Sequence, residues 1–356
     1  MAVAAVEYTT ADAWDALVAS HPQGHLLQSW AWGELKGEFG WRPLRIAVVD
    51  EAARIPYPRA AAQILIRRFL GLAVCYVPRG PLFAGDPVLD QALLHVLRRV
   101  ARRQRAAFLR LEPNILESAS LADVLHSQLQ VAGFRVAEPL QPRTSIHLSL
   151  APEPDRLFAA FSKGHRADVR RAERNGVAVR VGATAADLDA FYSMMQATAG
   201  RRGFGIHSRD YYRRAWELGG EAARLLVANQ KDGGDTAAFL VFGAGREGQY
   251  MYSASTAEGL KSGANHLLQW HAIRWARERG CALYDFWGVP EVVAGLPSAS
   301  EAEREQIEEQ AKAHPLYGAY RFKKGWGGEV VRYLPAYDQV YLAPAYWLWR
   351  RRESSA

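Results

Sequence analysis

Lysine, arginine and tyrosine side chains near the expected ends of strands and helices are the residues of this chain best suited to chemistry. The sequence has no GxSxG elbow and no P-loop, and the GxGxxG pattern over residues 243–248 joins two expected strands as a hairpin turn instead of opening a helix. Cys75 and Cys281 stand far apart in apolar runs, without CxxC spacing or a plausible histidine partner, so we expect buried thiols in a reducing compartment and no metal site. The remaining chemistry is the binding and stabilisation of oxyanions.

The charge of the chain fits that chemistry. Lys and Arg number 44 against 37 Asp and Glu, a net charge of +7 carried mostly by arginine, whose forked donors suit phosphates and nucleic acid. The helical pattern over residues 89–105 has one strongly basic face, with arginines at 98, 99, 102, 103 and 105. The alternative interpretation is the ordinary composition of an arginine-rich genome.

The elements that must position these residues follow one α/β plan used twice. A chain of 356 residues fits two domains. We expect a first domain over residues 1–150, a second over 151–335 that opens at the prolines near 152–154 and carries an exposed insertion at about 290–315, and a C-terminal segment over 336–356. Neither a signal peptide nor a membrane-spanning run is present, which predicts a cytoplasmic protein.

Seven strings distributed over nearly the whole chain resemble the FemABX family of peptidoglycan bridge-forming aminoacyltransferases. They are QSWAWGELK (28–36), YVPRGP (76–81), KGHRADVRRAERNGV (163–177), YMYSAS (250–255), ANHLLQW (264–270), YDFWGV (284–289) and YGAYRFKKGWGG (317–328). The resemblance implies an α/β (α+β) fold of two tandem acetyltransferase-like (GNAT) domains, with the C-terminal segment returning to the first. It further implies an aminoacyl-tRNA donor, a UDP-MurNAc-pentapeptide or lipid II acceptor, no cofactor and no covalent enzyme intermediate. We expect a monomer.

The resemblance assigns roles to two lysines and one tyrosine. Lys36 matches the lysine that holds the diphosphate of the acceptor, and Lys323 matches the lysine beside the reacting ester, where an ammonium would stabilise the oxyanion. If this segment is a strand, Lys324 points the opposite way, so only one of the two should face the site. Tyr252 matches a tyrosine of the acceptor site, although on a regular strand Tyr250 would point the same way and could take its part.

Other assignments are less specific. Glu112 stands where the family has an acidic residue at a strand end, and it could accept a proton or position the amine. Arg209, Tyr211 and Tyr212 are further acceptor-site candidates, although the family spacing for a second diphosphate-binding arginine falls nearer His207 or Ser208.

Two surface features have alternative interpretations. Arg166, Arg170 and Arg174 recur every four residues, so they lie along one side of a helix and could follow a tRNA backbone, unless they are simply a solvated face. The stretch from Tyr341 to Arg352 could contact the inner membrane surface peripherally, or it could pack its aromatic residues against the first domain.

Two rival functions remain open. The fold would permit an acyl-CoA-dependent N-acyltransferase, but neither half contains a Q/R-x-x-G-x-G/A phosphate loop leading into a helix. The basic helices would also suit a nucleic-acid-binding protein without catalysis, which salt-dependent binding with no turnover would reveal.

Overall fold

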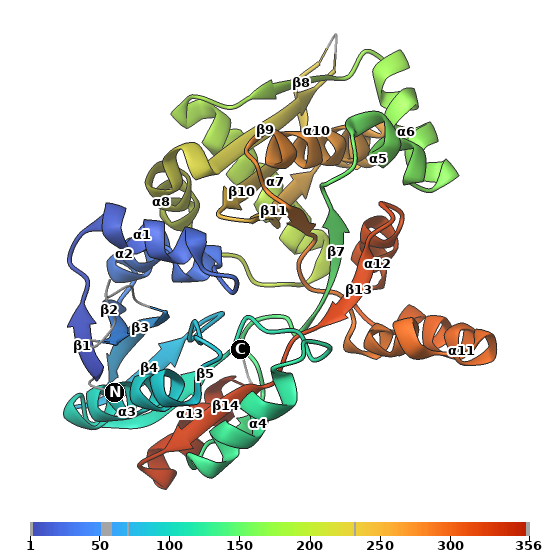
Figure 1. The fold of residues 1–356 in the computed structure, drawn as a ribbon. Helices are drawn as coiled ribbons and strands as arrows, with labels where there is room; N and C mark the ends of the chain where they lie inside the picture. The colour runs from blue at the N-terminus through green and yellow to red at the C-terminus, as the bar shows by residue number, and fades with distance from the viewer. Residues whose placement is uncertain (1–2, 51–58, 70, 231–232, 354–356) are drawn as a thin grey trace. The chain divides into compact units, whose positions relative to one another are not determined.

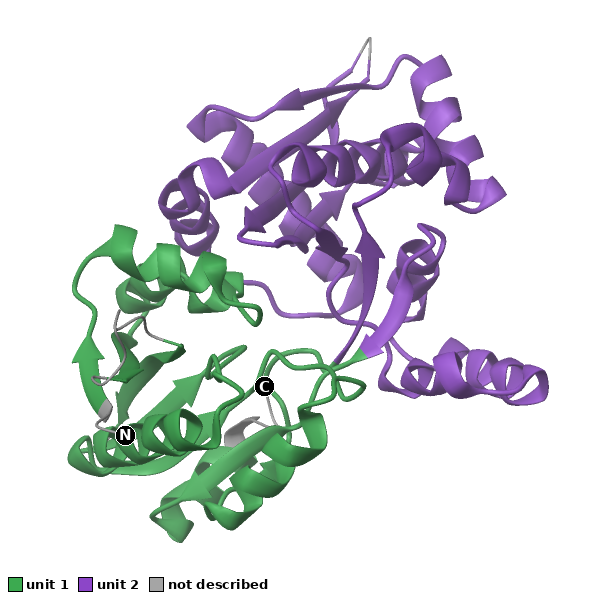
Figure 2. Ribbon diagram, viewed as in Figure 1, with its two compact units in different colours: residues 1–143, 332–356 green, residues 144–331 purple. Residues whose placement is uncertain are grey.

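The computed structural model describes residues 3–50, 59–69, 71–230 and 233–353. The chain forms two compact units (Figure 2): unit 1 comprises residues 1–143 and 332–356, and unit 2 comprises residues 144–331. The boundary therefore precedes the prolines at 152 and 154, because Pro154 begins a helix rather than marking the joint.

Unit 1 is built on a seven-stranded sheet (Figure 1) in the order β1-β2-β3-β4-β5-β14-β6. Strands β4 and β5 are parallel, and the other pairings given for this sheet are antiparallel. The C-terminal strand β14 lies between β5 and β6, so the end of the chain completes the first sheet. The strands are β1 (Val3–Glu7), β2 (Arg42–Asp50), β3 (Ala60–Phe69), β4 (Leu72–Val77), β5 (Ala106–Leu111), β6 (Arg135–Ala137) and β14 (Ala336–Val340).

Helices cover both faces of this sheet. Helix α3 begins after Asp86, whose carboxylate accepts from two backbone amides, and packs its apolar stripe on alternate β3 residues such as Ile64 and Ile66. Helices α1, α2 and α13 lie on the opposite face, where α13 packs on Val74 and Phe108. The helices of unit 1 are α1 (Ala11–Ser20), η1 (Leu26–Gln28), α2 (Trp30–Glu38), α3 (Pro87–Arg103), α4 (Ala122–Val131) and α13 (Ala343–Glu353).

Unit 2 repeats the plan with a sheet in the order β13-β7-β12-β11-β10-β9-β8. Strands β11 and β12 are parallel over three residue pairs, and β7 pairs with β12 from the other side. The strands are β7 (Thr144–Ser149), β8 (Ala178–Val181), β9 (Ala223–Asn229), β10 (Asp235–Ala244), β11 (Glu247–Ser255), β12 (Leu283–Asp285) and β13 (Glu329–Arg332).

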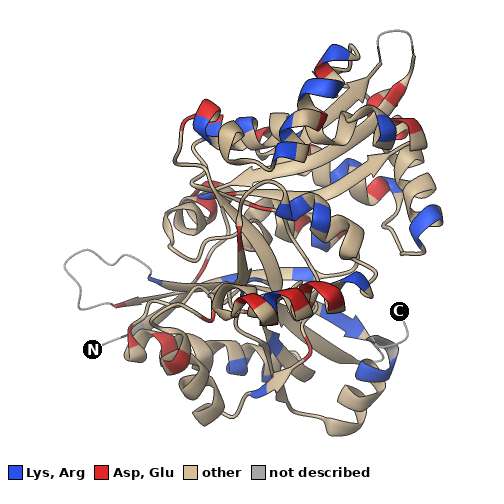
Figure 3. Cartoon of the chain, turned by 90° about the vertical axis from the view of Figure 1, so that its right-hand side faces the viewer, with Lys and Arg blue, Asp and Glu red and all other residues tan. Residues whose placement is uncertain are grey.

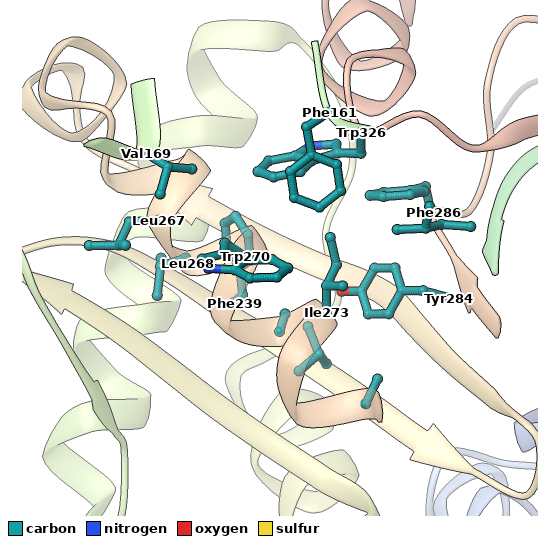
Figure 4. Close-up of a cluster of buried hydrophobic side chains, with 14 of the residues drawn as sticks. Phe161, Val169, Phe239, Leu267, Leu268, Trp270, Ile273, Tyr284, Phe286 and Trp326 are labelled. Carbon is teal, nitrogen blue, oxygen red and sulfur yellow. The ribbon is translucent and has the colours of Figure 1, made fainter. Parts of the chain in front are cut away.

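A large aromatic core fixes the helices of unit 2 on the sheet (Figure 4). Phe161 packs edge-on against both Trp270 and Trp326, and Trp326 is fully buried. Helices α6 and α10 cover this face, whereas α7 and α8 cover the other. The helices of unit 2 are α5 (Pro154–Ala160), α6 (Lys163–Arg174), α7 (Ala185–Arg202), α8 (Arg209–Gly219), η2 (Gly220–Ala222), α9 (Ala257–Ser262), α10 (Ala264–Glu278), η3 (Glu291–Ser298), α11 (Glu301–Lys312) and α12 (Tyr317–Lys324).

The structure shows the two cysteines, the insertion near residues 290–315 and the helical segment around residue 161. Both cysteines are buried, as predicted, and burial raises the pKa of Cys75 to about 12 and that of Cys281 to about 11. The insertion forms the helix α11, whose acidic side chains colour it mostly red in Figure 3. The helical pattern of residues 156–174 is divided into two helices, because Phe161 is extended and Ser162 caps a new helix. Among the helices of the described ranges, none has the length and apolarity needed to cross a membrane.

Candidate functional site

Lys323 is a buried lysine in the last turn of α12, a helix rather than the strand considered from the sequence. Its Nζ donates to the carbonyl oxygens of Gly288 at 2.7 Å and Trp287 at 3.2 Å, and it lies 5.9 Å from the centre of the Tyr250 ring. Burial lowers the pKa of Lys323 to about 8, although the nearby Asp285 carboxylate opposes that effect. The ammonium therefore remains largely protonated at neutral pH in an environment with little water.

The neighbouring Lys324 faces solvent and pairs with Glu308 on α11. Because successive residues of a helix point about 100° apart, one lysine of the pair is buried while the next is exposed. The structure thus places Lys323, and not Lys324, in the interior of unit 2.

The turn after β12 presents two carbonyl groups to Lys323. Trp287 has a φ of 62°, a left-handed conformation that is strained for a residue with a bulky side chain. The Asp285 carboxylate, fully buried, accepts a hydrogen bond from the Trp287 amide at 2.7 Å and another from Ser145. Strain of this kind is typical of functional sites, because the surrounding contacts must hold it in place.

A bulge in β11 separates the two tyrosines that the sequence placed on one face. Leu240 pairs with Tyr252 and Phe242 pairs with Gln249, so two residues of β11 lie opposite one of β10. Tyr250 consequently packs against Phe239 and points toward Lys323, whereas Tyr252 lies on the opposite face of the sheet. The expectation that Tyr250 and Tyr252 point the same way is therefore wrong.

Tyr252 belongs to an aromatic cluster with the candidates on α8. The Tyr212 ring centre lies 5.0 Å from that of Tyr252, and Tyr211 shares a hydrogen bond with Tyr252 and stacks on His207 at 3.9 Å. Burial raises the pKa of Tyr252 well above its ordinary value, so the hydroxyl stays protonated. Arg209 does not join the cluster: its exposed side chain pairs with Asp189.

An open pocket of about 690 Å³, with both polar and apolar lining residues, lies beside the Lys323 segment. His165 and His266 meet there edge-to-face at 4.7 Å, and the His165 ring hydrogen-bonds the carbonyl of Phe322 at 2.7 Å. Burial and the neighbouring His165 lower the pKa of His266 to about 4, so it is neutral at pH 7. Phe322 and Lys324, the sequence neighbours of Lys323, line this pocket, whereas the Lys323 side chain points into the interior of unit 2 and is not part of the lining. The lining residues are Ser162, Gly164, His165, Asp168, His266, Glu308, Tyr317, Gly318, Arg321, Phe322, Lys324 and Gly325.

In unit 1, Lys36 lies in the last turn of α2 among aromatic rings and a second cation. Its Nζ is 4.8 Å from the Trp32 ring centre, and burial together with the charge of Arg67 lowers the pKa of Lys36 to about 8. The Arg67 guanidinium in turn lies over Trp41 at 5.7 Å, and Trp41 leans against Tyr76 on β4. Two cations held this close favour a multiply charged anion between them.

Glu112 is buried at the end of β5, and its carboxylate is engaged by three donors. Tyr76 donates its hydroxyl at 2.7 Å, and the backbone amides of Leu140 and Gln141 donate at 2.5 and 3.2 Å. Burial raises the pKa of Glu112. These contacts fasten the segment near residue 140 to the sheet, and a catalytic role for Glu112 stays a prediction.

The arginines of α6 form the expected stripe but differ in their surroundings. Arg166 donates to the carbonyls of Ala159 and Phe161 and thereby ties α6 to the preceding helix. Arg170 and Arg174 are exposed, and Arg170 lines a second cavity of about 470 Å³ with Phe158, its guanidinium 5.5 Å from that ring.

Sequence reasoning did not identify Tyr250 as the tyrosine beside Lys323, nor Asp285, Trp287, Arg67 and the pair His165 and His266 as parts of these sites. The bulge and the left-handed turn have no clear signal in one sequence, since neither Tyr250 nor Trp287 is a residue type that favours them. The string YDFWGV, which carries part of the family resemblance, contains this turn. The turn contacts Lys323 through backbone carbonyl groups, and a pattern of residue types does not reveal where those groups point.

Comparison with known proteins relates the chain to one family. The family model described as "FemAB family" matches residues 9–231 and 221–350. The lipid II:glycine glycyltransferase of Staphylococcus saprophyticus is 25% identical over 95% of this chain and 93% of its own length. The crystal structure of FemX superposes with a TM-score of 0.81 at 23% identity, covering 98% of this chain and 99% of that one.

A tandem GNAT protein from the clavulanic acid biosynthesis pathway superposes with a TM-score of 0.52 at 12% identity, covering 95% of this chain and 98% of its own. These likenesses confirm the predicted fold of two GNAT-like units in tandem. The two sheets, each with one parallel pair in the same relative place, are the structural basis of that likeness.

Proposed function

This chain belongs to the FemAB family, and we propose that it transfers an amino acid from aminoacyl-tRNA to a side-chain amine in the stem peptide of a peptidoglycan precursor. Its similarity to lipid II:glycine glycyltransferases supports an aminoacyltransferase that builds the bridge between stem peptides. The observation that carries the mechanism is the buried ammonium of Lys323, held by two carbonyls of a strained turn.

The proposed reaction replaces an ester with an amide. The free amine of the acceptor attacks the aminoacyl carbonyl carbon, and the carbonyl oxygen takes up negative charge in the tetrahedral intermediate. Lys323 has three N–H donors, of which two are directed at Trp287 and Gly288, so the third can stabilise that oxyanion. When the intermediate collapses, the ester bond to the ribose oxygen breaks and that oxygen takes the proton lost by the amine.

An ester is already an activated acyl group, so positioning and charge stabilisation can supply most of the catalysis. Neither the positioning of the substrates nor the stabilisation of the oxyanion requires a nucleophile from the enzyme. The buried thiols of Cys75 and Cys281 are in any case unsuited to attack, because burial keeps them protonated.

For the donor, we assign the pocket lined by the sequence neighbours of Lys323 to the 3′ end of the tRNA. Phe322 offers a ring on which a base can stack, and Arg321 offers a cationic side chain for a phosphate, whereas Lys324 is paired with Glu308. For the acceptor, Lys36 and Arg67 form the cationic pair of unit 1 that would hold a diphosphate. The aromatic cluster of Tyr211, Tyr212 and Tyr252 is a further acceptor-binding surface under this proposal.

An acyl-CoA donor is less well supported. A helix N-terminus that binds a pyrophosphate must be open, but α6 approaches the first turn of α10 so closely that a Cβ at Gly263 would lie 2.7 Å from the carbonyl oxygen of Asp168. Gly263 itself, with a φ of 89°, caps α10 in a left-handed conformation that permits this approach.

The test compares donors directly. Purified protein is incubated with a muropeptide precursor and either a mixture of charged tRNAs or acetyl-CoA, and the product masses are measured. A mass gain of one aminoacyl residue with charged tRNA alone is the expected result. A gain of an acetyl group, or no gain with any charged tRNA, would contradict the proposed function.

A further inference from the structure

One end of the unit 1 sheet gathers four segments that are distant in the sequence. Arg42, the first residue of β2, pairs with Ile66 of β3, so the chain that follows α2 lies at this end. Phe69 pairs with Leu72 at the β3–β4 turn, and Ala73 pairs with Ala106 at the start of β5. Val340, the last residue of β14, pairs with Phe108, so α13 starts at this same end. The C-terminus of α3 is also there, since Arg105, two residues beyond α3, accepts from the Ala73 amide through its carbonyl. We call this region the basic end.

Charge at the basic end is strongly one-sided. Across residues 36–42, 66–73, 99–106 and 340–349 the sequence has eight Lys and Arg residues and a single acidic residue, Glu38. The four arginines of the α3 terminus are exposed, and none of them forms an ion pair with any residue that the structure describes: Arg99, Arg102, Arg103 and Arg105. Such unneutralised cations attract a polyanionic partner.

Large apolar side chains stand exposed at the basic end and along α13. Phe69 is 51% exposed and Leu342 is 41% exposed, while Trp347 and Leu348 on α13 are 61% and 65% exposed. The exposed positions 344, 347, 348 and 351 recur at helical spacing, so they form one outer face that combines Trp347 and Leu348 with the exposed Arg351.

The inner face of α13 is fixed to the sheet. Tyr346 and Trp349 pack edge-on against Phe108 with ring centres 5.2 and 6.0 Å away, and the Tyr346 hydroxyl donates to Asp338 at 2.9 Å. The C-terminal aromatic residues were expected either to pack against the first domain or to contact a membrane surface. Tyr346 and Trp349 pack against the sheet of unit 1, whereas Trp347 remains exposed. A helix anchored on one side holds its outer face ready for contact without unfolding.

We propose that the basic end and the outer face of α13 dock unit 1 onto an anionic lipid bilayer, so that the enzyme uses a lipid-linked acceptor. This inference rests on the proposed function. Exposed tryptophan and leucine suit the boundary between headgroups and acyl chains, and arginines beside them suit anionic headgroups. No part of the surface needs to span the membrane.

The position of Lys36 supports the lipid-linked acceptor. Arg67, which lies close enough to Lys36 to lower its pKa, is followed directly by Arg68 and Phe69 of the basic end. Lys36 on α2 and the helix α13 lie on the same face of the sheet. The diphosphate of a lipid-linked precursor lies at the level of the headgroups, so a docked unit 1 would receive it without pulling the lipid from the bilayer.

A nucleic acid is the other polyanion to consider, but the exposed apolar side chains argue against it. Binding to a phosphate backbone is served by cations and by aromatic rings that stack on bases. The aliphatic side chains of Leu342 and Leu348 contribute nothing to that contact, whereas they gain from leaving water at a lipid surface.

The test uses the whole chain and vesicles of phosphatidylglycerol mixed with phosphatidylcholine, against vesicles of phosphatidylcholine alone. We expect sedimentation with the anionic vesicles only, weakened by salt. The variants W347S/L348S and R102Q/R103Q/R105Q should each lower partition by about tenfold to a hundredfold. Matched controls should bind like the wild type: V131S, which changes a residue 88% exposed on α4, and R156Q/R246Q/R304Q, which removes the same charge from unit 2.

Transfer assays separate this inference from the proposed function. W347S/L348S should lose transfer to a lipid-linked acceptor in vesicles and retain transfer to a soluble nucleotide-linked one. Absence of vesicle binding in the wild type, or equal binding by all variants, overturns the docking surface even if transfer occurs. Weaker tRNA binding by R102Q/R103Q/R105Q, with vesicle binding unchanged, identifies a nucleic-acid surface instead. If no acceptor is ever modified, the proposed function fails while the sedimentation result still decides the docking surface.

Discussion

Replacing Lys323 with methionine should show how much the buried ammonium contributes to the transfer reaction and how much it destabilises the fold. The pKa of Lys323 is lowered from 10.5 to about 8 in the folded protein. This gap of about 2.5 pH units corresponds to about 3 kcal/mol, since each unit is worth about 1.4 kcal/mol. The pKa of Lys323 is lower in the folded protein than in the unfolded chain, so burying the charged lysine destabilises the fold. This loss of stability is complete below about pH 8, and it disappears as the pH rises toward 10.5, because the folded protein then releases the proton first.

The stability of the wild type relative to Lys323→Met should therefore rise with pH across this window and stay constant below it. Groups that titrate equally in both proteins cancel from the difference. The measurement is hydrogen exchange followed by mass spectrometry, with peptides from α12 and β12 reporting the unit that carries Lys323. At the same time transfer should fall by about 10²- to 10³-fold, because one preorganised donor to the oxyanion is lost.

Lys324→Met is the matched control, since Lys324 is exposed and pairs only at the surface with Glu308. It should keep wild-type turnover and show no pH-dependent difference in this window. If the difference in stability between wild type and Lys323→Met does not change between about pH 7 and about pH 10, the claim that burial lowers the pKa of Lys323 is wrong. Equal turnover of those two proteins would refute its part in the reaction.

Three further predictions concern the remaining candidates. Lys36→Ala should weaken binding of a diphosphate-bearing acceptor but scarcely change use of the bare peptide, as measured by calorimetry; equal losses for both would contradict a phosphate contact. Glu112→Gln should lower the free energy of unfolding by about 1–3 kcal/mol while folded protein keeps its turnover, and a pure loss of turnover would instead make Glu112 catalytic. Arg170→Gln with Arg174→Gln should reduce the salt dependence of charged-tRNA binding by roughly one to two counterions, and an unchanged slope would leave these arginines as a solvated face.

The sequence was sufficient for the parts of the fold that depend on periodic patterns. The apolar stripe and basic face of α3, the strands of the second sheet and the exposed insertion helix all have clear periodicity, and the structure contains each of them. The tandem GNAT plan and the family were also reached from motifs. Lys323 is buried and Lys324 is exposed, on a helix and not on the strand considered from the sequence, and the expectation that only one of the two faces the site stays a prediction.

What the sequence could not supply is backbone geometry determined by tertiary packing. The bulge in β11 moves Tyr250 to the face opposite Tyr252, and the left-handed Trp287 turns two carbonyls toward Lys323. The helix break at Phe161 is similar, because the ring is drawn into the aromatic core against Trp270 and Trp326. In each case a core contact outweighs the local preference of the residue, and one chain alone gives no sign of it.

The most direct test of the central claim follows a labelled aminoacyl group from its tRNA into the acceptor in a single turnover. The tRNA is charged with a radiolabelled amino acid, and wild type, Lys323→Met and Lys324→Met are compared with a muropeptide precursor in excess. We expect rapid appearance of label in the precursor for wild type and Lys324→Met, and a rate lower by about 10²- to 10³-fold for Lys323→Met. Label that stays on the tRNA with the wild type, or that moves equally fast with Lys323→Met, would contradict it.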